Sequence, residues 1–169
     1  MSGAAHSLPA PGGSPDAAAY WAGARAGQLL LRRCRDCGHW HFLPRVLCPH
    51  CWSEALDWVP ASGAGWIHSF SIVRRAPLPA FAPLTPYVVA LIDLAEGPRM
   101  LANIVGSGAL DCAIGEAVHV CFEARGAALA TEPGDADGAG VGPAAPGANV
   151  LPQFRRGRLP AGAGMGAGA

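Results

Sequence analysis

Residues 29–51 read LLLRRCRDCGHWHFLPRVLCPHC and contain two Cys-x-x-Cys pairs, Cys34 with Cys37 and Cys48 with Cys51. Ten residues, GHWHFLPRVL, separate the pairs. A spacing of two residues lets both thiolates of a tight turn face one ion, and two such turns complete a tetrahedral site with four sulfur ligands. The sequence therefore predicts a metal site formed by Cys34, Cys37, Cys48 and Cys51.

Zinc is the expected ion at this site, and iron is the alternative because a rubredoxin site uses the same four ligands. His39, His41 and His50 lie beside the cysteines in the sequence. We expect them to stay outside the coordination shell, exposed or supporting the ligands, because four cysteines already fill it. Four thiolates leave no open position for a substrate, so the ion is expected to be structural.

Composition limits the size of the core and the kind of partner. The chain has 169 residues, with 12 arginines against 12 acidic residues and a formal net charge of zero, which argues against a nucleic-acid binder driven by bulk charge. It also has 23 glycines and 16 prolines, and its large apolar residues concentrate in residues 29–122. A foldable part of about one hundred residues has a small core, so a bound ion is expected to add needed stability.

The cysteines also bear on the cellular compartment. No segment has the length and hydropathy of a membrane span or the pattern of a signal peptide, so we expect a cytoplasmic protein. In a reducing compartment, six cysteines are metal ligands or core residues more often than disulfides.

The pattern before and around the cysteines predicts two units. Residues 1–27 are expected to form a flexible tail followed by a helix that ends at Gly27. Tyr20 and Trp21 fall on one stripe of this helix and must pack either on this chain or on a partner. Residues 28–60 are expected to form a zinc ribbon.

The periodicity changes to two after Gly65, which predicts β-strands. Residues 65–75 are expected to form a strand with even-numbered residues on one face and odd-numbered residues on the other. Residues 75–86 contain four prolines and are predicted to be a loop. The further predicted strands are a hairpin of 87–94 and 99–106, then 117–123, then 150–154 with Pro152 marking a sheet edge.

Together these strands predict a barrel over residues 61–158, with a flexible insertion at 127–148 and a disordered Gly/Ala tail at 159–169. A small closed barrel removes exposed strand edges, and an OB-like barrel is the natural candidate. The expected fold is mainly β, with an N-terminal helix, a four-cysteine zinc ribbon and a five-stranded OB-fold barrel.

Several segments together resemble a specific family, the rubredoxin-like zinc-ribbon plus OB-fold proteins. These were long catalogued as a domain of unknown function, and they accompany thiolases and related acyl-CoA enzymes. The matching stretches are YW at 20–21, the cysteine segment 29–51, GAGWIHSFSIVRRAP at 63–77, PYVVALIDLAEGPRMLANIVG at 86–106, IGEAVHVCFE at 114–123 and LPQFR at 151–155. The resemblance covers most of residues 20–156.

The resemblance implies a non-catalytic accessory or scaffold subunit in a hetero-oligomer. Family members associate with thiolase-fold condensing enzymes, with aldolases of the same fold or with hot-dog-fold acyl-CoA hydratases, and they can shape the passage for the CoA or acyl group. The candidate contacts with a partner or with acyl-CoA are the aromatic residues of the helix and the segment after the first barrel strand. They are Tyr20, Trp21, Arg74, Arg75 and Phe81.

Two other functions compete with this interpretation. OB barrels and zinc ribbons also bind single-stranded nucleic acid, with Trp66, Phe70 and Phe122 as candidate stacking residues, although zero net charge counts against it. A self-sufficient enzyme has the least support, because the sequence contains no nucleophile elbow, phosphate loop or dinucleotide motif. We therefore predict no catalytic residue.

Overall fold

The computed structural model of this protein describes residue 8, residues 15–125 and residues 149–157. A short 3-10 turn, η1 (Pro15–Ala17), leads into helix α1 (Ala18–Arg25). Three strands then form a sheet in the order β2-β1-β3. They are β1 (Leu30–Cys34), β2 (Trp40–His41) and β3 (Leu56–Pro60).

Five strands form the second unit, a closed barrel in the order β4-β5-β6-β8-β7. They are β4 (Ala64–Val73), β5 (Tyr87–Leu94), β6 (Arg99–Val105), β7 (Ala117–Arg125) and β8 (Asn149–Arg156). Strand β4 pairs with both β5 and β7, which closes the barrel, and β6 with β8 is the one parallel pair among the described strands. The predicted fold class, with its five-stranded OB-like barrel, is confirmed.

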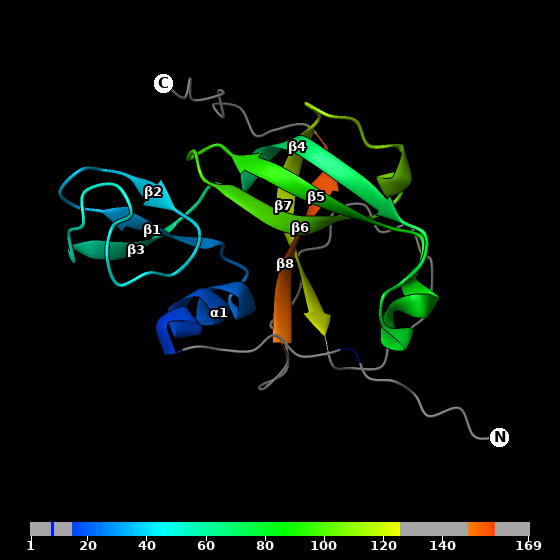
Figure 1. The fold of residues 1–169 in the computed structure, drawn as a ribbon, viewed down its shortest axis with the longest axis horizontal. Coiled ribbons are helices and arrows are strands. Elements are labelled where there is room, and N and C mark those ends of the chain that lie inside the picture. The colour runs from blue at the N-terminus through cyan, green and yellow to red at the C-terminus, as the bar shows by residue number, and fades with distance from the viewer. Residues whose placement is uncertain (1–7, 9–14, 126–148, 158–169) are drawn as a thin grey trace.

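The core lies inside the barrel and extends to the helix. Alternation along the strands places Ile67, Val88, Ile92, Val118 and Phe154 in the interior, where all are fully buried. Helix α1 contacts both β1 and β8, so it joins the ribbon to the barrel. Figure 1 shows this arrangement, with the ribbon at one side of the barrel and α1 below the ribbon, beside the lower end of β8.

The end of α1 follows its sequence signal. Gly27 has a φ of 72°, the left-handed conformation that favours glycine. The backbone N–H of Gln28 donates to Gly23 O at 2.8 Å, and that of Gly27 donates to Ala24 O at 3.0 Å. This pair of bonds is a Schellman motif, which satisfies helix carbonyls that would otherwise lack a partner.

Strand β4 departs from the strict alternation predicted for residues 65–75. Its register with β5 shifts between Ile67 and Ser69, which leaves His68 as the extra residue of a β-bulge. Ile67 faces the core before the bulge, and Phe70 packs against the core after it. The predicted assignment of faces is therefore wrong beyond the bulge, because one extra residue exchanges the two sides.

The prediction that Pro152 marks a sheet edge is also wrong, since β8 pairs with β6 and β7. The pairing with β6 begins only at Phe154, opposite Ile104, so the missing N–H of Pro152 costs no bond on that side. The buried Gln153 side chain covers the gap, and its Oε1 accepts the Asn103 N–H at 3.0 Å.

The loop predicted at 75–86 contains a 3-10 helix, η2 (Pro79–Leu84), and a shorter one, η3 (Ala109–Asp111), precedes β7. Pro79 suits the start of η2, where its missing N–H costs nothing. The predicted flexible insertion 127–148 and tail 159–169 lie outside the described residues, as does the N-terminal tail apart from residue 8. Within the described part of the chain, no helix is long and apolar enough to cross a membrane.

Candidate metal centre

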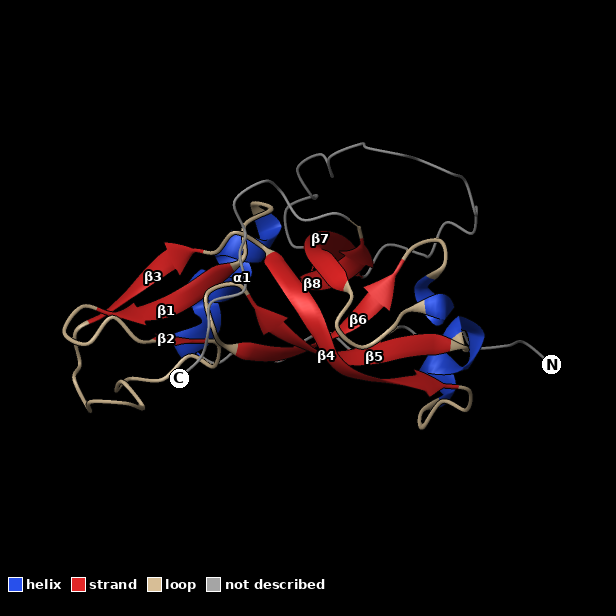
Figure 2. Cartoon of the chain, turned by 90° about the horizontal axis from the view of Figure 1, so that it is seen from above, coloured by secondary structure: helices blue, strands red, loops and turns tan. Residues whose placement is uncertain are grey.

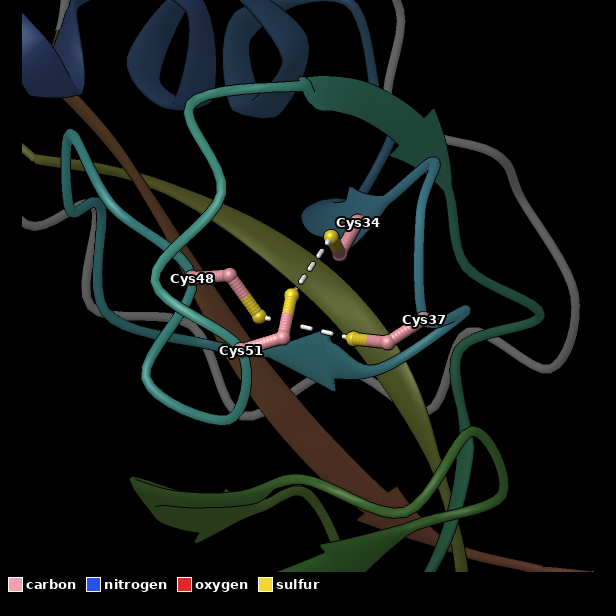
Figure 3. A group of neighbouring side chains, drawn as sticks. All are labelled: Cys34, Cys37, Cys48 and Cys51. Atoms are coloured by element: carbon pink, nitrogen blue, oxygen red, sulfur yellow. Dashed lines mark hydrogen bonds between the residues drawn. The ribbon is translucent and has the colours of Figure 1, made fainter.

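Four sulfur atoms converge at one end of the ribbon (Figure 3). The Sγ atoms of Cys34, Cys37, Cys48 and Cys51 all lie within 4.8 Å of one another, and the structure thereby brings together every predicted ligand. The nearest pairs, Cys34 with Cys51 and Cys37 with Cys48, are 3.6 Å apart. Zinc–sulfur bonds of about 2.3 Å place the sulfurs of a tetrahedral site about 3.8 Å apart. The donor set and its spacing therefore fit a four-coordinate ion.

Two turns of the same construction hold these sulfurs, and we call them the knuckles. In the first knuckle, the N–H of Cys34 donates to His39 O at 2.9 Å and the N–H of Gly38 donates to Cys34 O at 3.0 Å. The second knuckle repeats both bonds, each at 2.9 Å, with Cys48, Ser53 and Trp52 in the equivalent places. Because the two knuckles share the same backbone hydrogen bonds, each directs its pair of cysteine sulfurs toward the same site.

The knuckles differ in the residue that takes the left-handed conformation. Gly38 has a φ of 73° in the first knuckle, and Trp52 has a φ of 63° in the second. Any residue other than glycine is disfavoured there by about 1 to 2 kcal/mol. The Trp52 side chain is 75% exposed, so little packing within this chain offsets that cost.

The electrostatics of the cluster favour a bound cation. The backbone N–H of Cys37 lowers the pKa of the Cys34 thiol to about 7. At Cys51 the backbone N–H of Ser53 also lowers the pKa, but the neighbouring sulfurs and burial outweigh it and raise the pKa to about 12. One thiolate thus opposes ionisation of the next, and a divalent cation permits all four to be thiolates.

The three neighbouring histidines do not join the four sulfur ligands. The ring of His39 stacks on His50 at 5.3 Å and on His41 at 6.4 Å between centroids. His39 and His50 are exposed, as expected, whereas His41 is only 7% exposed. Neither ring nitrogen of His41 has a hydrogen-bond partner among the described residues, and burial lowers its pKa.

The other candidate contact residues lie in two separate places. Tyr20 and Trp21 are on α1, whereas Arg74 and Arg75 directly follow β4 and Phe81 is in η2. Figure 1 shows α1 and the end of β4 on opposite sides of the molecule. The sequence left open whether Tyr20 packs on this chain or on a partner. Its ring packs in this chain's own core and is 8% exposed. Trp21 and Phe81 are half-buried, and both arginines are exposed.

A polar cluster that the sequence analysis missed lies on the outer surface of the barrel. Arg99 donates from Nε to Asp93 Oδ1 at 2.6 Å and from Nη2 to Oδ2 at 3.1 Å, and its Nη2 lies 2.9 Å from His68 Nδ1. The Arg99 hydrogen bonds lower the pKa of Asp93. The predicted hairpin puts Asp93 and Arg99 near the same turn, but its four-residue turn would set Leu94 opposite Arg99, whereas the structure pairs Asp93 with Arg99. The bulge that brings in His68 leaves no mark in the residue pattern.

Comparison with known proteins agrees with the two units of the structure. The family description "ChsH2, rubredoxin-like zinc ribbon domain" matches residues 21–57, and "ChsH2, C-terminal OB-fold domain" matches residues 58–123. A DUF35 domain-containing scaffold protein of Methanothermobacter thermautotrophicus is 36% identical over 95 residues, which cover 56% of this chain and 71% of the relative. This chain belongs to the DUF35 scaffold family.

Other relatives of this DUF35 chain bear the names of enzyme subunits. A probable enoyl-CoA hydratase alpha subunit of Thermomonospora curvata is 39% identical over 98 residues, which span 58% of the DUF35 chain but only 30% of the relative. The benzoylsuccinyl-CoA thiolase subunit BbsA of Thauera aromatica is 36% identical over 101 residues, 58% of this chain and 67% of BbsA.

Among solved structures, a chain of the "Ltp2-ChsH2(DUF35) aldolase" has a TM-score of 0.67 and 30% identity to the DUF35 chain. The superposition covers 86% of this chain and 98% of that one. The predicted family resemblance is confirmed, and with it the order of a ribbon followed by an OB barrel.

Proposed function

We propose that this protein is a non-catalytic accessory subunit that binds and supports an enzyme acting on acyl-CoA substrates. The observation that carries the proposal is its likeness to the chain of the Ltp2-ChsH2(DUF35) aldolase, which extends over nearly the whole of that chain. A thiolase subunit and a hydratase subunit among the relatives add two further acyl-CoA enzymes. A thiolase-fold condensing enzyme or aldolase is the preferred partner.

The metal centre supports a structural role. We infer that zinc occupies the site in a cytoplasmic protein, where the four thiols stay reduced. Cys34, Cys37, Cys48 and Cys51 would hold the ion, which would fix the two knuckles to each other. Four sulfur ligands leave no position at which a substrate or a water molecule could be activated.

The polar side chains of the described residues also favour a non-catalytic subunit. No serine, threonine or cysteine side chain among them hydrogen-bonds to a histidine side chain, so none has the histidine base of a serine or cysteine nucleophile. The one hydroxyl–carboxylate pair among the described residues, Ser53 with Asp36, lies on the exposed ribbon surface. The cluster of His68, Asp93 and Arg99 pairs its own charges. Phe70 and Phe122 pack against the core, which removes them as free stacking residues for nucleic acid.

The contact residues and the class of the partner remain part of the proposal. Trp21, Arg74, Arg75 and Phe81 are the predicted contacts that we retain, and Tyr20 is dropped because its ring is in the core. An acyl-CoA hydratase is the second candidate partner, favoured by the 39% identity to the Thermomonospora curvata relative.

The test is purification of the tagged full chain from its native host, followed by mass spectrometry of the bound proteins. We expect an acyl-CoA enzyme in fixed ratio, whose activity or stability falls when this chain is removed. The fold of that enzyme separates the thiolase-like partner from the hydratase. Recovery of this chain alone as a monomer, or turnover of an acyl-CoA by the isolated chain, would contradict the proposal.

A further inference from the structure

An apolar stripe runs along the outer surface of the barrel on β5, where water normally favours polar side chains, between the polar residues Ser71 of β4 and Asn103 of β6, which both lie opposite Val89. Strand β5 shows this most clearly, because its alternate residues are apolar on both faces. Facing inward are Val88, Ala90, Ile92 and Leu94. Facing outward are Tyr87, Val89, Leu91 and Asp93, all half-buried. The Phe81 ring of η2 lies 6.5 Å from that of Tyr87 and covers this end of the strand in part. Strands with one face in water alternate apolar and polar residues, whereas apolar residues on both faces are typical of a strand buried on both sides.

The neighbouring strand extends this apolar surface. Leu101 of β6 lies directly opposite Leu91 and is 62% exposed. Figure 1 looks onto β4, β5 and β6 with β7 and β8 behind them, and Figure 2 shows the same side from above. In both views, no helix or strand of residues 15–125 and 149–157 covers the middle of these strands. We call the surface formed by Tyr87, Val89, Leu91 and Leu101 the outer barrel face.

The two ends of the outer barrel face are polar but differ in charge pairing. At one end, Asp93 is already bound to Arg99 and His68. At the other end, β4 continues into Arg74 and Arg75, which are exposed and form no hydrogen bond or ion pair with the described residues. An apolar centre with a polar rim is the usual anatomy of a protein–protein interface.

We propose that the partner enzyme docks on the outer barrel face, an inference that rests on the proposed function. The partner would present apolar side chains to Leu101 and Leu91, and carboxylates to Arg74 and Arg75. Such an occupant matches the surface in both hydrophobicity and charge.

Two other occupants match this surface less well. A second copy of this chain that pairs the same face could cover the apolar centre, but the only carboxylate on β4, β5 and β6 is that of Asp93, which Arg99 already neutralises. Coenzyme A could supply phosphates to Arg74 and Arg75 but would leave the apolar centre exposed. A partner protein with its own acidic residues satisfies both parts of the face, and the test below distinguishes it from the other two occupants.

The experiment uses the metal-loaded full chain and the recombinant enzyme identified by co-purification. Titration calorimetry compares Leu101→Arg with Leu43→Arg, a leucine of the ribbon that is 57% exposed. We expect Leu101→Arg to weaken binding at least about 30-fold, as loss of a central contact does, and Leu43→Arg to change it less than about twofold. Both variants should keep the wild-type melting temperature, because both side chains are exposed.

A second pair of variants tests the charged end. Arg75→Glu is compared with Arg45→Glu, whose arginine is also exposed but lies in the ribbon. We expect Arg75→Glu to weaken binding about 3- to 10-fold and to reduce its dependence on salt, since charges at the rim act mainly on the association rate. Arg45→Glu should leave both quantities unchanged.

The inference would be overturned if Leu101→Arg bound the enzyme with wild-type affinity, or if Leu43→Arg lost its affinity for the enzyme. It would also be overturned if Arg75→Glu lost affinity for coenzyme A but kept its full affinity for the enzyme. A wild-type homodimer that Leu101→Arg dissociates would assign the face to a second copy. If the wild-type chain captures no acyl-CoA enzyme, the proposed function itself fails, which is a separate result from any difference between the variants.

Discussion

The ribbon and the barrel are both built mainly from antiparallel strand pairs, yet they differ in the interactions that stabilise them. In the barrel, the fully buried side chains are large and apolar, such as Ile92 and Phe154. In the ribbon beyond Leu31, the fully buried side chains are Cys34 and Cys48, which belong to the sulfur cluster. Three short strands enclose little apolar surface of their own, and Leu31 and the half-buried Trp58 instead pack in the core shared with the barrel. The ribbon therefore depends on ion binding in addition to this shared core, whereas the barrel depends on hydrophobic burial.

Loss of the metal should have the largest effect and should separate the two units. Cys48→Ser removes a ligand, and structural zinc sites contribute on the order of 10 kcal/mol to folding. We expect residues 30–60 to lose hydrogen-exchange protection while β4 to β8 keep theirs. Exchange measured by mass spectrometry on the full chain, with metal content from the same sample, checks this.

Cys121→Ser is the matched control for this experiment, since Cys121 lies in β7 away from the cluster. It should retain the metal and full protection of the ribbon. Equal loss of protection in ribbon and barrel for Cys48→Ser would show that the two units unfold together.

Truncation of the barrel core should give the opposite pattern. Phe154 is fully buried, and Phe154→Ala is expected to lower the free energy of unfolding by about 3 to 5 kcal/mol through lost burial and a cavity. Denaturant unfolding measures the stability of the barrel, and the metal content at each denaturant concentration reports on the ribbon. Below the unfolding midpoint the variant should still bind its ion. Leu110→Ala, at an exposed leucine of η3, should change stability by less than about 0.5 kcal/mol.

An acidic transition should report on the barrel through Glu116. Burial raises the pKa of Glu116, but the Arg156 side chain and the Ala113 N–H outweigh it, so the folded pKa is lowered. A lowered carboxylate pKa stabilises the fold above the unfolded value and loses that contribution as the pH falls through the folded value. Glu116→Gln should therefore cost about 1 kcal/mol at pH 7, and this cost should shrink as the pH falls through the folded pKa of Glu116.

Thermal unfolding of the wild type and of Glu116→Gln at several pH values measures the difference in stability. Both proteins keep a second contact between β8 and the start of η3, because Arg156 Nη1 also donates to Gly108 O at 2.6 Å. Asp57→Asn is the control, since the Asp57 carboxylate pairs with Arg35 on the exposed ribbon surface. A penalty for Glu116→Gln that persists unchanged at pH 3 would show that packing, and not charge, accounts for it.

Features set by residues close in sequence could be predicted, and features set by distant strands could not. The Cys-x-x-Cys spacing, the Gly27 helix end and the 87–106 hairpin each depend on a few neighbouring residues. The bulge at His68 and the interior position of β8 depend on which strands pair across the barrel. Pro152 shows the limit, because the proline lies where β8 has no backbone partner in β6, as the local rule requires, yet the strand as a whole lies between β6 and β7.

The smallest effect is expected within the ribbon, where the knuckles differ at Gly38 and Trp52. Trp52→Gly removes about 1 to 2 kcal/mol of left-handed backbone strain and so stabilises the fold. Glycine also has greater freedom in the unfolded chain, which destabilises the fold by about 0.5 to 1 kcal/mol. The metal-loaded variant should thus gain about 0.5 kcal/mol, and Gly38→Ala should lose about 1 kcal/mol. A Trp52→Gly ribbon that is less stable in the isolated chain would mean that the exposed ring contributes more through packing than its backbone costs. If stability rises as expected but affinity for the partner enzyme falls, the strained tryptophan is kept for binding.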